Sequence, residues 1–382
     1  MRGGAPRFLA PEGLRAAFLA GALLGLLPAS AARAQSVAPQ PSRASPSPAA
    51  SSPAASSPSP AGPSLAVPAP THGTAVPAAP VAAARPRKVT TSAVAVAAHP
   101  PTGTAGDAAY GAYQQGRYAT ALRLGLARAD SNDAVAMTLI AEIYAQGLGV
   151  PQDPARARGW YEKAAALGNP DAQFALGVMK LQGSGEAQDE VGAAQLFLAS
   201  AQQGNPAAAY NLGMLYLQGN GVPREAEAAA EWFRRAARKD QPDALYALAI
   251  LYREGNGVRQ DPAEAARLLE RAVMVDHTVA TVEYAIMVFN GVGVPKDEAK
   301  AAQLFRKAAL AGNPIAQNRL ARILSAGRGM PRDPITAAAW YLAAKGRGLD
   351  DPLLQKMYDE MTPADRAAAE KKVADWQGQG PA

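Results

Sequence analysis

The stretch AAAYNLGMLYLQGNGVPREAEAAAEWFRRAARKDQP, residues 207–242, decides the fold of this chain. An Asn-Pro pair directly before it is typical of a helix N-cap followed by the first helical residue. An apolar helical stripe follows, and Gly219 and Gly221 then end the helix, because glycine adopts a positive φ without a Cβ clash. A second helix carries Trp232 and Phe233 on its apolar face. The stretch predicts an αα-hairpin, which must bury its apolar face against neighbours.

The neighbours are present, because the Gly-x-Gly pair recurs six times with a constant step of 36 residues. The pairs are Gly147/Gly149, Gly183/Gly185, Gly219/Gly221, Gly255/Gly257, Gly291/Gly293 and Gly327/Gly329. An alanine in the first helix keeps the same step from Ala136 to Ala316, and a large residue in the second helix does so from Tyr161 to Tyr341. The sequence therefore predicts an all-α solenoid of antiparallel helix pairs, in which each repeat packs only on its neighbours.

Polar residues mark the helix starts. An aspartate precedes five of the second helices, where its carboxylate can cap unpaired amides. These are Asp153, Asp189, Asp261, Asp297 and Asp333. A Gly-Asn-Pro triplet ends one hairpin and starts the next at 168–170, 204–206 and 312–314.

These motifs resemble the Sel-one-like repeat, a subclass of the tetratricopeptide-like solenoids. The resemblance rests on Gly-x-Gly-Val-Pro, on Ala-x-x-x-Leu-Gly, and on the segment WYEKAAALGNP at 160–170. It covers six repeats over about 135–350, and it implies a right-handed superhelix and an adaptor or assembly role. The sequence departs from the pattern at 184–186 and at 276–278, which puts the geometry of those two turns in question.

The chain before the repeats has two further zones. Residues 1–34 resemble a secretory signal peptide, with early arginines, an apolar run over 16–27 and an Ala-Arg-Ala cleavage site. An uncleaved anchor is the alternative, but the run is shorter than the ~20 residues that a bilayer span needs. Residues 35–105 are rich in Pro, Ala and Ser and lack acidic and aromatic residues, so we expect a disordered tether.

Both ends of the array are expected to be capped. Residues 106–134 hold a partial hairpin, and residues 351–382 hold two further helix starts, at Asp351-Pro352 and at Thr362-Pro363. The second of these resembles a capping box.

Charge bears on the class of partner. The chain carries a net charge of +6, of which residues 1–34 contribute three and residues 35–105 contribute four, leaving −1 for residues 106–382. The folded part therefore lacks the positive surface that nucleic-acid binding requires. We expect no nucleic acid as a partner, and no stable membrane insertion once the signal is removed.

The residues for catalysis, metal binding or cofactor binding are missing from the sequence pattern. The chain has no cysteine, and two of its three histidines lie in the tether. His277 occupies the turn position that holds Asn169, Asn205 and Asn313, so a turn role is favoured over a ligand role. The Gly-x-Gly pairs follow helices and lack a third glycine, which argues against dinucleotide binding. We expect no enzyme activity, no metal and no cofactor.

Binding is the function that stacked helix pairs favour. Two columns of the first helices step by 36 residues and are named here after their residues in the third repeat. The Tyr210 column is Thr138, Phe174, Tyr210, Tyr246, Val282 and Asn318, and the Met214 column is Glu142, Val178, Met214, Ile250, Ile286 and Arg322. We expect Phe174, Val178, Tyr210, Met214, Tyr246 and Ile250 to line a concave groove for a peptide or a partner helix. Packing between repeats is the alternative reading of the same columns.

The sequence therefore predicts a non-enzymatic protein-binding scaffold in the cell envelope. A periplasmic location is favoured, and an extracellular one stays open. A regulator of a membrane sensor or of an assembly complex would fit, and a structural or carbohydrate-binding role in cell-wall or exopolysaccharide assembly is the alternative.

Overall fold

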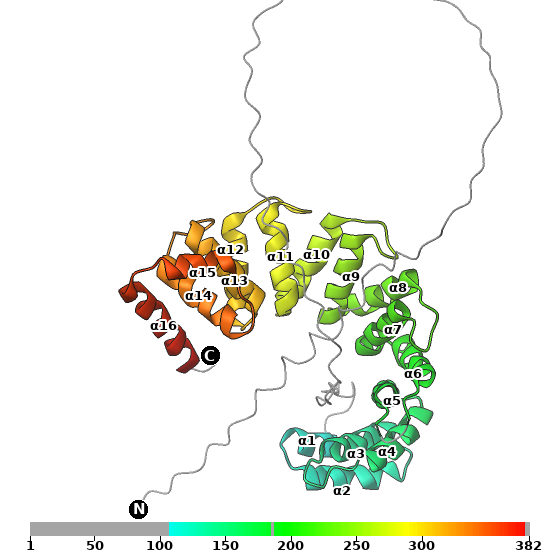
Figure 1. Cartoon of the computed structure of the whole chain (residues 1–382). Helices are drawn as coiled ribbons and strands as arrows, with labels where there is room; N and C mark the ends of the chain where they lie inside the picture. The colour runs from blue at the N-terminus through cyan, green and yellow to red at the C-terminus, as the bar shows by residue number, and fades with distance from the viewer. Residues whose placement is uncertain (1–106, 185–186, 379–382) are drawn as a thin grey trace, which may run out of the picture. The chain divides into compact units, whose positions relative to one another are not determined.

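The computed structural model describes residues 107–184 and 187–378. Within these ranges the chain forms sixteen α-helices and no strand, and each helix contacts the next one in the chain (Figure 1). The all-α solenoid expected from the 36-residue step is thereby confirmed. The expected signal peptide, the expected tether and the irregular turn at Gly185 lie outside the described residues.

Every repeat pairs a first helix with a second helix, and the two lengths are almost constant. The first helices are α3 (Ala134–Gln146), α5 (Pro170–Gln182), α7 (Pro206–Gln218), α9 (Pro242–Glu254), α11 (Thr278–Asn290) and α13 (Pro314–Ala326). The second helices are α4 (Pro154–Ala166), α6 (Glu190–Gln202), α8 (Ala226–Ala237), α10 (Pro262–Met274), α12 (Glu298–Leu310) and α14 (Pro334–Gly346). This regular alternation keeps equivalent side chains at equivalent places in successive repeats.

The helix starts use the caps that the sequence predicts. The side chain of Asn169 accepts hydrogen bonds from the backbone N–H groups of Asp171 and Ala172, at 3.0 and 2.9 Å. Each of the five aspartates before a second helix likewise accepts at least one N–H of the first turn. Such a cap satisfies amides that have no partner within the helix, and its loss typically costs about 1 kcal/mol.

The two glycines of a pair have different structural roles. The first glycine is the C-cap of the first helix, with φ near +70° at Gly219 and its equivalents. In the five pairs whose second glycine the structure describes, that glycine also has a positive φ. It packs against the preceding helix pair: a Cβ on Gly221 would overlap the backbone carbonyl of Glu190 at the start of α6. The second glycine is therefore required both by its backbone conformation and by the close packing of adjacent repeats.

The irregular turn at 276–278 keeps the geometry of the regular ones. Asp276 adopts φ 58°, the left-handed conformation that Gly168, Gly204 and Gly312 adopt in the equivalent turns. Aspartate tolerates this region better than most residues. His277 replaces the capping asparagine, and its Nδ1 accepts the N–H of Ala280 at 3.0 Å. The role in the turn expected for His277 is confirmed.

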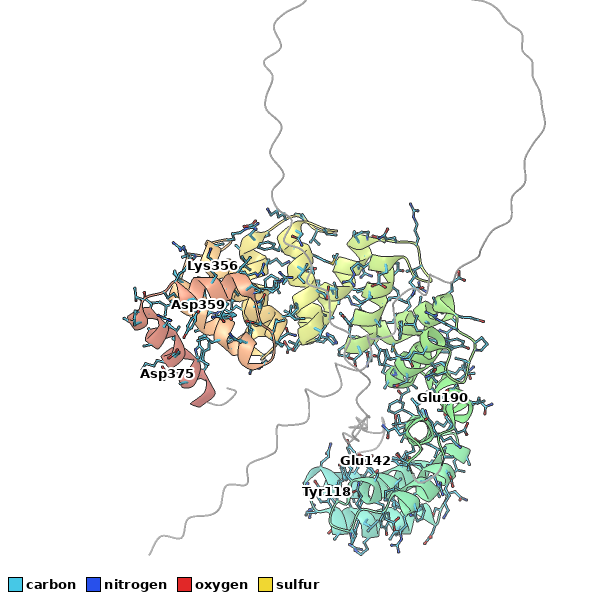
Figure 2. The ribbon with its side chains drawn as sticks, in the orientation of Figure 1. Tyr118, Glu142, Glu190, Lys356, Asp359 and Asp375 are labelled. Carbon is cyan, nitrogen blue, oxygen red and sulfur yellow. The ribbon has the colours of Figure 1, made fainter. Side chains whose placement is uncertain are left out.

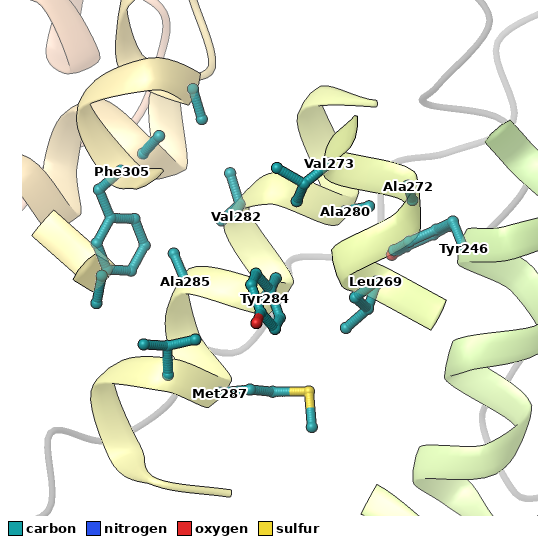
Figure 3. Packing of buried hydrophobic residues seen from close by; sticks show 14 of the residues in the cluster. Tyr246, Leu269, Ala272, Val273, Ala280, Val282, Tyr284, Ala285, Met287 and Phe305 are labelled. Atoms are coloured by element: carbon teal, nitrogen blue, oxygen red, sulfur yellow. The ribbon is translucent and has the colours of Figure 1, made fainter. Parts of the chain in front are cut away.

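The core lies between the two helices of each hairpin and between hairpins. Large second-helix side chains such as Phe197 and Phe233 are fully buried, and they pack onto Gly177 and Gly213 of the first helices. A Cβ on Gly213 would lie 2.7 Å from the ring of Phe233, so the small column makes room for the large one. Figure 3 shows buried hydrophobic side chains of the fourth and fifth repeats, among them Leu269 and Phe305 from the column of large second-helix residues.

Additional helices pack on both ends of the array. At the N-terminal end these are α1 (Ala108–Gln114) and α2 (Tyr118–Ala129), and at the C-terminal end α15 (Pro352–Asp359) and α16 (Pro363–Gly378). The Trp376 ring on α16 stacks on Trp340 of α14, with centroids 4.2 Å apart. α2 thus contacts the first helix of the first repeat, and α15 and α16 contact the second helix of the sixth.

Candidate functional site

The Tyr210 column does not present a uniform surface. Phe174 and Tyr246 are buried, with exposed fractions of 7% and 8%. The Phe174 ring packs against Phe197 of the same repeat at 5.8 Å between centroids, and Tyr246 stacks on the His277 ring at 5.2 Å. Both rings therefore contribute to the core, and Figure 3 shows Tyr246 among the buried side chains of its cluster.

Tyr210 is the half-buried ring of this column. It contacts Phe233 of α8 at 5.7 Å between centroids and packs against the edges of two apolar clusters. Burial, together with the negative charge of Asp243 and the neighbouring Tyr246, raises the pKa of its hydroxyl. The raised pKa favours the protonated hydroxyl, and the residue as a whole stays partly accessible to solvent.

The Met214 column likewise contains both half-buried and fully buried residues. Val178, Met214 and Ile286 are half-buried, whereas Ile250 is 4% exposed. Of the six residues expected to bind a partner, three thus retain accessible surface and three are core residues. We call the accessible set Val178, Tyr210 and Met214 the first-helix face. Partner binding at the six residues stays a prediction.

At the N-terminal end of the Met214 column, Glu142 is a buried carboxylate with an exposed fraction of 6% (Figure 2). Its carboxylate accepts a hydrogen bond from the Tyr161 hydroxyl at 2.8 Å and another from the Gln146 amide. Burial raises the pKa of Glu142, and the two hydrogen bonds oppose that effect. At this end, the Met214 column therefore contributes a buried carboxylate with its hydrogen bonds formed, and not an accessible surface.

At the C-terminal end both columns bind the residue that starts α15. Asp351, the N-cap of α15, is 3% exposed. Its Oδ2 accepts hydrogen bonds from Asn318 Nδ2 at 2.8 Å and from Arg322 Nε at 2.6 Å. Asp351 is buried, which raises its pKa, but these donors outweigh the burial and lower the pKa overall. The end residues of the columns are therefore structural.

Sequence reasoning missed the column next to Tyr210. In the third to sixth repeats this column places Asn211, Ala247, Glu283 and Arg319 at half-buried positions. Glu283 accepts a hydrogen bond from Arg253 of the preceding repeat at 2.7 Å, a salt bridge between repeats. The signal was available in the sequence, because Glu283 and Arg319 share the 36-residue step.

Among the described residues, no group of three His, Asp or Glu side chains lies close enough together to hold a metal ion. Over the same ranges, no helix combines the length and apolarity needed to cross a bilayer. The side chains on the first helices can bury apolar surface, donate hydrogen bonds and pair charges. These are the interactions of a binding surface.

The Sel1 repeat family model matches six consecutive segments of the chain. They are 134–169, 170–205, 206–241, 242–277, 278–313 and 314–348. Their boundaries coincide with the start of each first helix. No match was found among curated proteins.

Several solved structures are similar, and two of them share at least 28% identity with this chain. A protective antigen of uropathogenic Escherichia coli strains, described as displaying an SLR fold, is 30% identical with a TM-score of 0.63. That match covers 71% of this chain and 60% of the antigen, so the chain spans less than two thirds of the antigen's length. A Sel1 repeat protein from Oxalobacter formigenes is 28% identical with a TM-score of 0.56, over 62% of this chain and 95% of its own.

Proposed function

Because the chain belongs to the Sel1-repeat family, we propose that it is a non-catalytic scaffold that binds another protein through the first-helix face. Sel1-repeat proteins generally mediate protein–protein interactions, and the family is typically non-catalytic. The observation that carries the proposal is the accessible apolar surface of Val178, Tyr210 and Met214 on consecutive first helices. Half-exposed aromatic and methionine side chains are enriched at protein interfaces.

We also propose that the scaffold acts in the cell envelope, with the periplasm as its compartment and a sensor or assembly complex as its setting. The support is the sequence of residues 1–34, with its apolar run and Ala-Arg-Ala site. Intact-mass measurement of the envelope fraction should give a chain that begins at Gln35. A membrane-bound chain that still begins at Met1 would contradict export with cleavage.

The second candidate function, carbohydrate handling in wall or exopolysaccharide assembly, fits the surface less well. Sugars commonly stack on an open aromatic face, and the half-buried Trp160 and Trp232 are the tryptophans that qualify among the second helices. A cation lies over each ring, Lys163 at 4.3 Å and Arg235 at 4.4 Å from the centroid. A sugar would have to displace these cations, each contact being worth ~0.5–1 kcal/mol at an exposed site.

Photo-crosslinking in the native host tests the proposal. A benzophenone amino acid is placed at Met214 on the first-helix face, and in a second strain at Gln195, which is exposed on α6. We expect a discrete protein adduct from position 214 that is absent from position 195, because the label reacts with what lies within contact distance. The adduct is then identified by mass spectrometry.

Equal labelling from both positions, or none from position 214, would contradict binding at the first-helix face. Retention of the purified chain on peptidoglycan or exopolysaccharide, without a protein adduct, would favour the carbohydrate function instead.

A further inference from the structure

Arg319 on α13 is a half-buried cation whose donors find no acceptor among the described residues. Its neighbour Arg322 donates to Asp351 at 2.6 Å, whereas none of the guanidinium N–H groups of Arg319 forms a hydrogen bond or salt bridge within the described chain. Burial, and next the charge of Arg322, lower the pKa of Arg319, while the negative charge of Asp351 opposes them in part. An arginine in proteins nevertheless stays protonated, so this helix carries a guanidinium whose charge Asp351, shared with Arg322, compensates only in part.

Asp351 cannot serve as the missing acceptor. Its Oδ2 accepts hydrogen bonds from Asn318 and Arg322, and its Oδ1 accepts the backbone N–H groups of Leu353 and Leu354 at 3.1 and 3.4 Å. Both oxygens are thus engaged in holding α15. The cluster contains two guanidinium groups and one carboxylate, which leaves one positive charge without a partner.

The repeat before it does not supply a carboxylate either. Glu283 stands 36 residues before Arg319, at the equivalent position of α11, but its carboxylate pairs with Arg253 on the side of the fourth repeat. In the earlier repeats the same position is uncharged. Arg319 is therefore the one residue of this column with an unmatched charge. Partial burial of such a charge is unfavourable until an anion binds.

We propose that Arg319 binds the carboxylate of an acidic side chain in the polypeptide that occupies the first-helix face. The inference rests on the proposed function, and it specifies the partner: a segment whose apolar residues contact Tyr210 and Met214 and whose Asp or Glu reaches the sixth repeat. A guanidinium presents a planar fork of donors that matches a carboxylate. The single unmatched charge is neutralised by one carboxylate, whereas a phosphate dianion would exceed it.

Peptide selection on the full-length chain tests this assignment. A phage-displayed library of random linear peptides is selected on three proteins: the wild type, Arg319→Ala and Arg306→Ala. Arg306 is the matched control, an exposed arginine on the second helix of the fifth repeat. We expect wild type and Arg306→Ala to enrich apolar peptides with Asp or Glu at a fixed position, and Arg319→Ala to lose that acidic preference.

Affinity measurements then test the interaction between Arg319 and the acidic residue of the peptide. One wild-type-selected peptide is compared with its Glu→Gln or Asp→Asn form by calorimetry. The amide form should bind wild type about tenfold more weakly, the factor expected for one charge-assisted hydrogen bond. On Arg319→Ala the two forms should bind equally well. The melting temperature of Arg319→Ala should not fall, because the guanidinium that it removes makes no intramolecular hydrogen bond.

The outcomes separate the two proposals. Selected peptides without an acidic preference, or with the same preference on Arg319→Ala, would overturn the role of Arg319 and leave the scaffold function standing. A phosphoserine form that binds more tightly than the Glu form would overturn the carboxylate as ligand. A selection that enriches no peptide on any of the three proteins would count against both proposals.

Discussion

The central repeats and the two ends of the array use the same two columns of the first helix for different purposes. In the centre, Tyr210 and Met214 are half-buried apolar residues without a polar role. At the ends, Glu142 is a buried carboxylate held by Tyr161, and Arg322 holds Asp351 of the capping helix. One position in the repeat can therefore offer surface or build structure, depending on its side chain and on the partners that surround it.

The difference shows how a solenoid limits its length. A terminal repeat lacks a neighbour on one side and must bury that side under a cap, and at the C-terminal end Asn318 and Arg322 hold the start of that cap through Asp351. Central repeats have neighbours on both sides, which frees their accessible columns for a partner. Three comparisons test this division, in order of decreasing expected effect.

The largest effect is expected from an alanine at the second glycine of a pair, compared between centre and end. Gly221 and Gly149 share a φ of +68°, but a Cβ on Gly149 meets Tyr118 Cβ at 3.1 Å, whereas one on Gly221 overlaps the Glu190 backbone. Gly221→Ala should cost roughly 4 kcal/mol, ~1–2 for the left-handed backbone and the rest for forced displacement of α6. Gly149→Ala should cost only the ~1–2 kcal/mol of the backbone.

Urea unfolding followed by circular dichroism measures both variants. Equal losses would mean that the central contact is no tighter than the one at the N-terminal end.

A second comparison uses the two arginines of α13. Arg322→Ala leaves the buried Asp351 carboxylate without its cation, which should cost about 3 kcal/mol and release α15. Arg319→Ala removes a cation that has no partner and lies beside another, so stability should stay the same or rise slightly. Thermal denaturation measures the stability change of each variant, and hydrogen exchange shows whether α15 is released. A loss for Arg319→Ala as large as that for Arg322→Ala would contradict the assigned roles.

The third comparison concerns the pH dependence of stability, which has opposite signs at the two ends of the array. The raised pKa of Glu142 means that its carboxyl favours the folded state most when protonated, and this contribution is lost as pH rises through the folded pKa. The lowered pKa of Asp351 means that its contribution is complete above the unfolded pKa, and is lost as pH falls through the folded one. Acidification from neutral pH should therefore loosen α15 before α3.

Hydrogen exchange, corrected for its intrinsic pH dependence, follows the two helices separately. Glu142→Gln and Asp351→Asn are the controls, since each should remove the pH dependence of its own end and leave the other end unchanged. Equal loosening of both helices in the wild type would show that these two carboxyls do not determine the response.

Much of the fold could be predicted from the sequence because its determinants are local. Asparagine caps, aspartate caps and left-handed glycines act within a few residues, and the 36-residue step places them in register. The close approach of Gly221 to Glu190 could not be predicted, because a positive φ alone already explains a glycine. The contact with the preceding repeat depends on how the hairpins stack. Capping and turn preferences act within a few residues and do not determine that stacking.

The site was harder to predict, because exposure within one column depends on a neighbour outside it. Tyr246 is covered by the His277 ring, whereas the residue equivalent to His277 one repeat earlier is Gln241. The Gln241 side chain caps Ala244 and offers no ring for Tyr210 to stack on. A periodic pattern therefore identified the column, but it could not tell the half-exposed tyrosine from the buried one.

The affinity of the crosslinked partner for Tyr210→Ala tests the central claim most directly. The control is Trp232→Ala, which removes a half-buried aromatic side chain from the second helix of the same repeat. Both variants lose packing, so affinity is measured per folded molecule at a temperature below both melting transitions. We expect Tyr210→Ala to weaken binding at least tenfold, as truncation of an interface anchor costs ~2 kcal/mol or more, and Trp232→Ala to bind normally. Normal affinity for Tyr210→Ala, with a lowered melting temperature, would show that Tyr210 serves packing alone and would contradict the first-helix face as the binding surface.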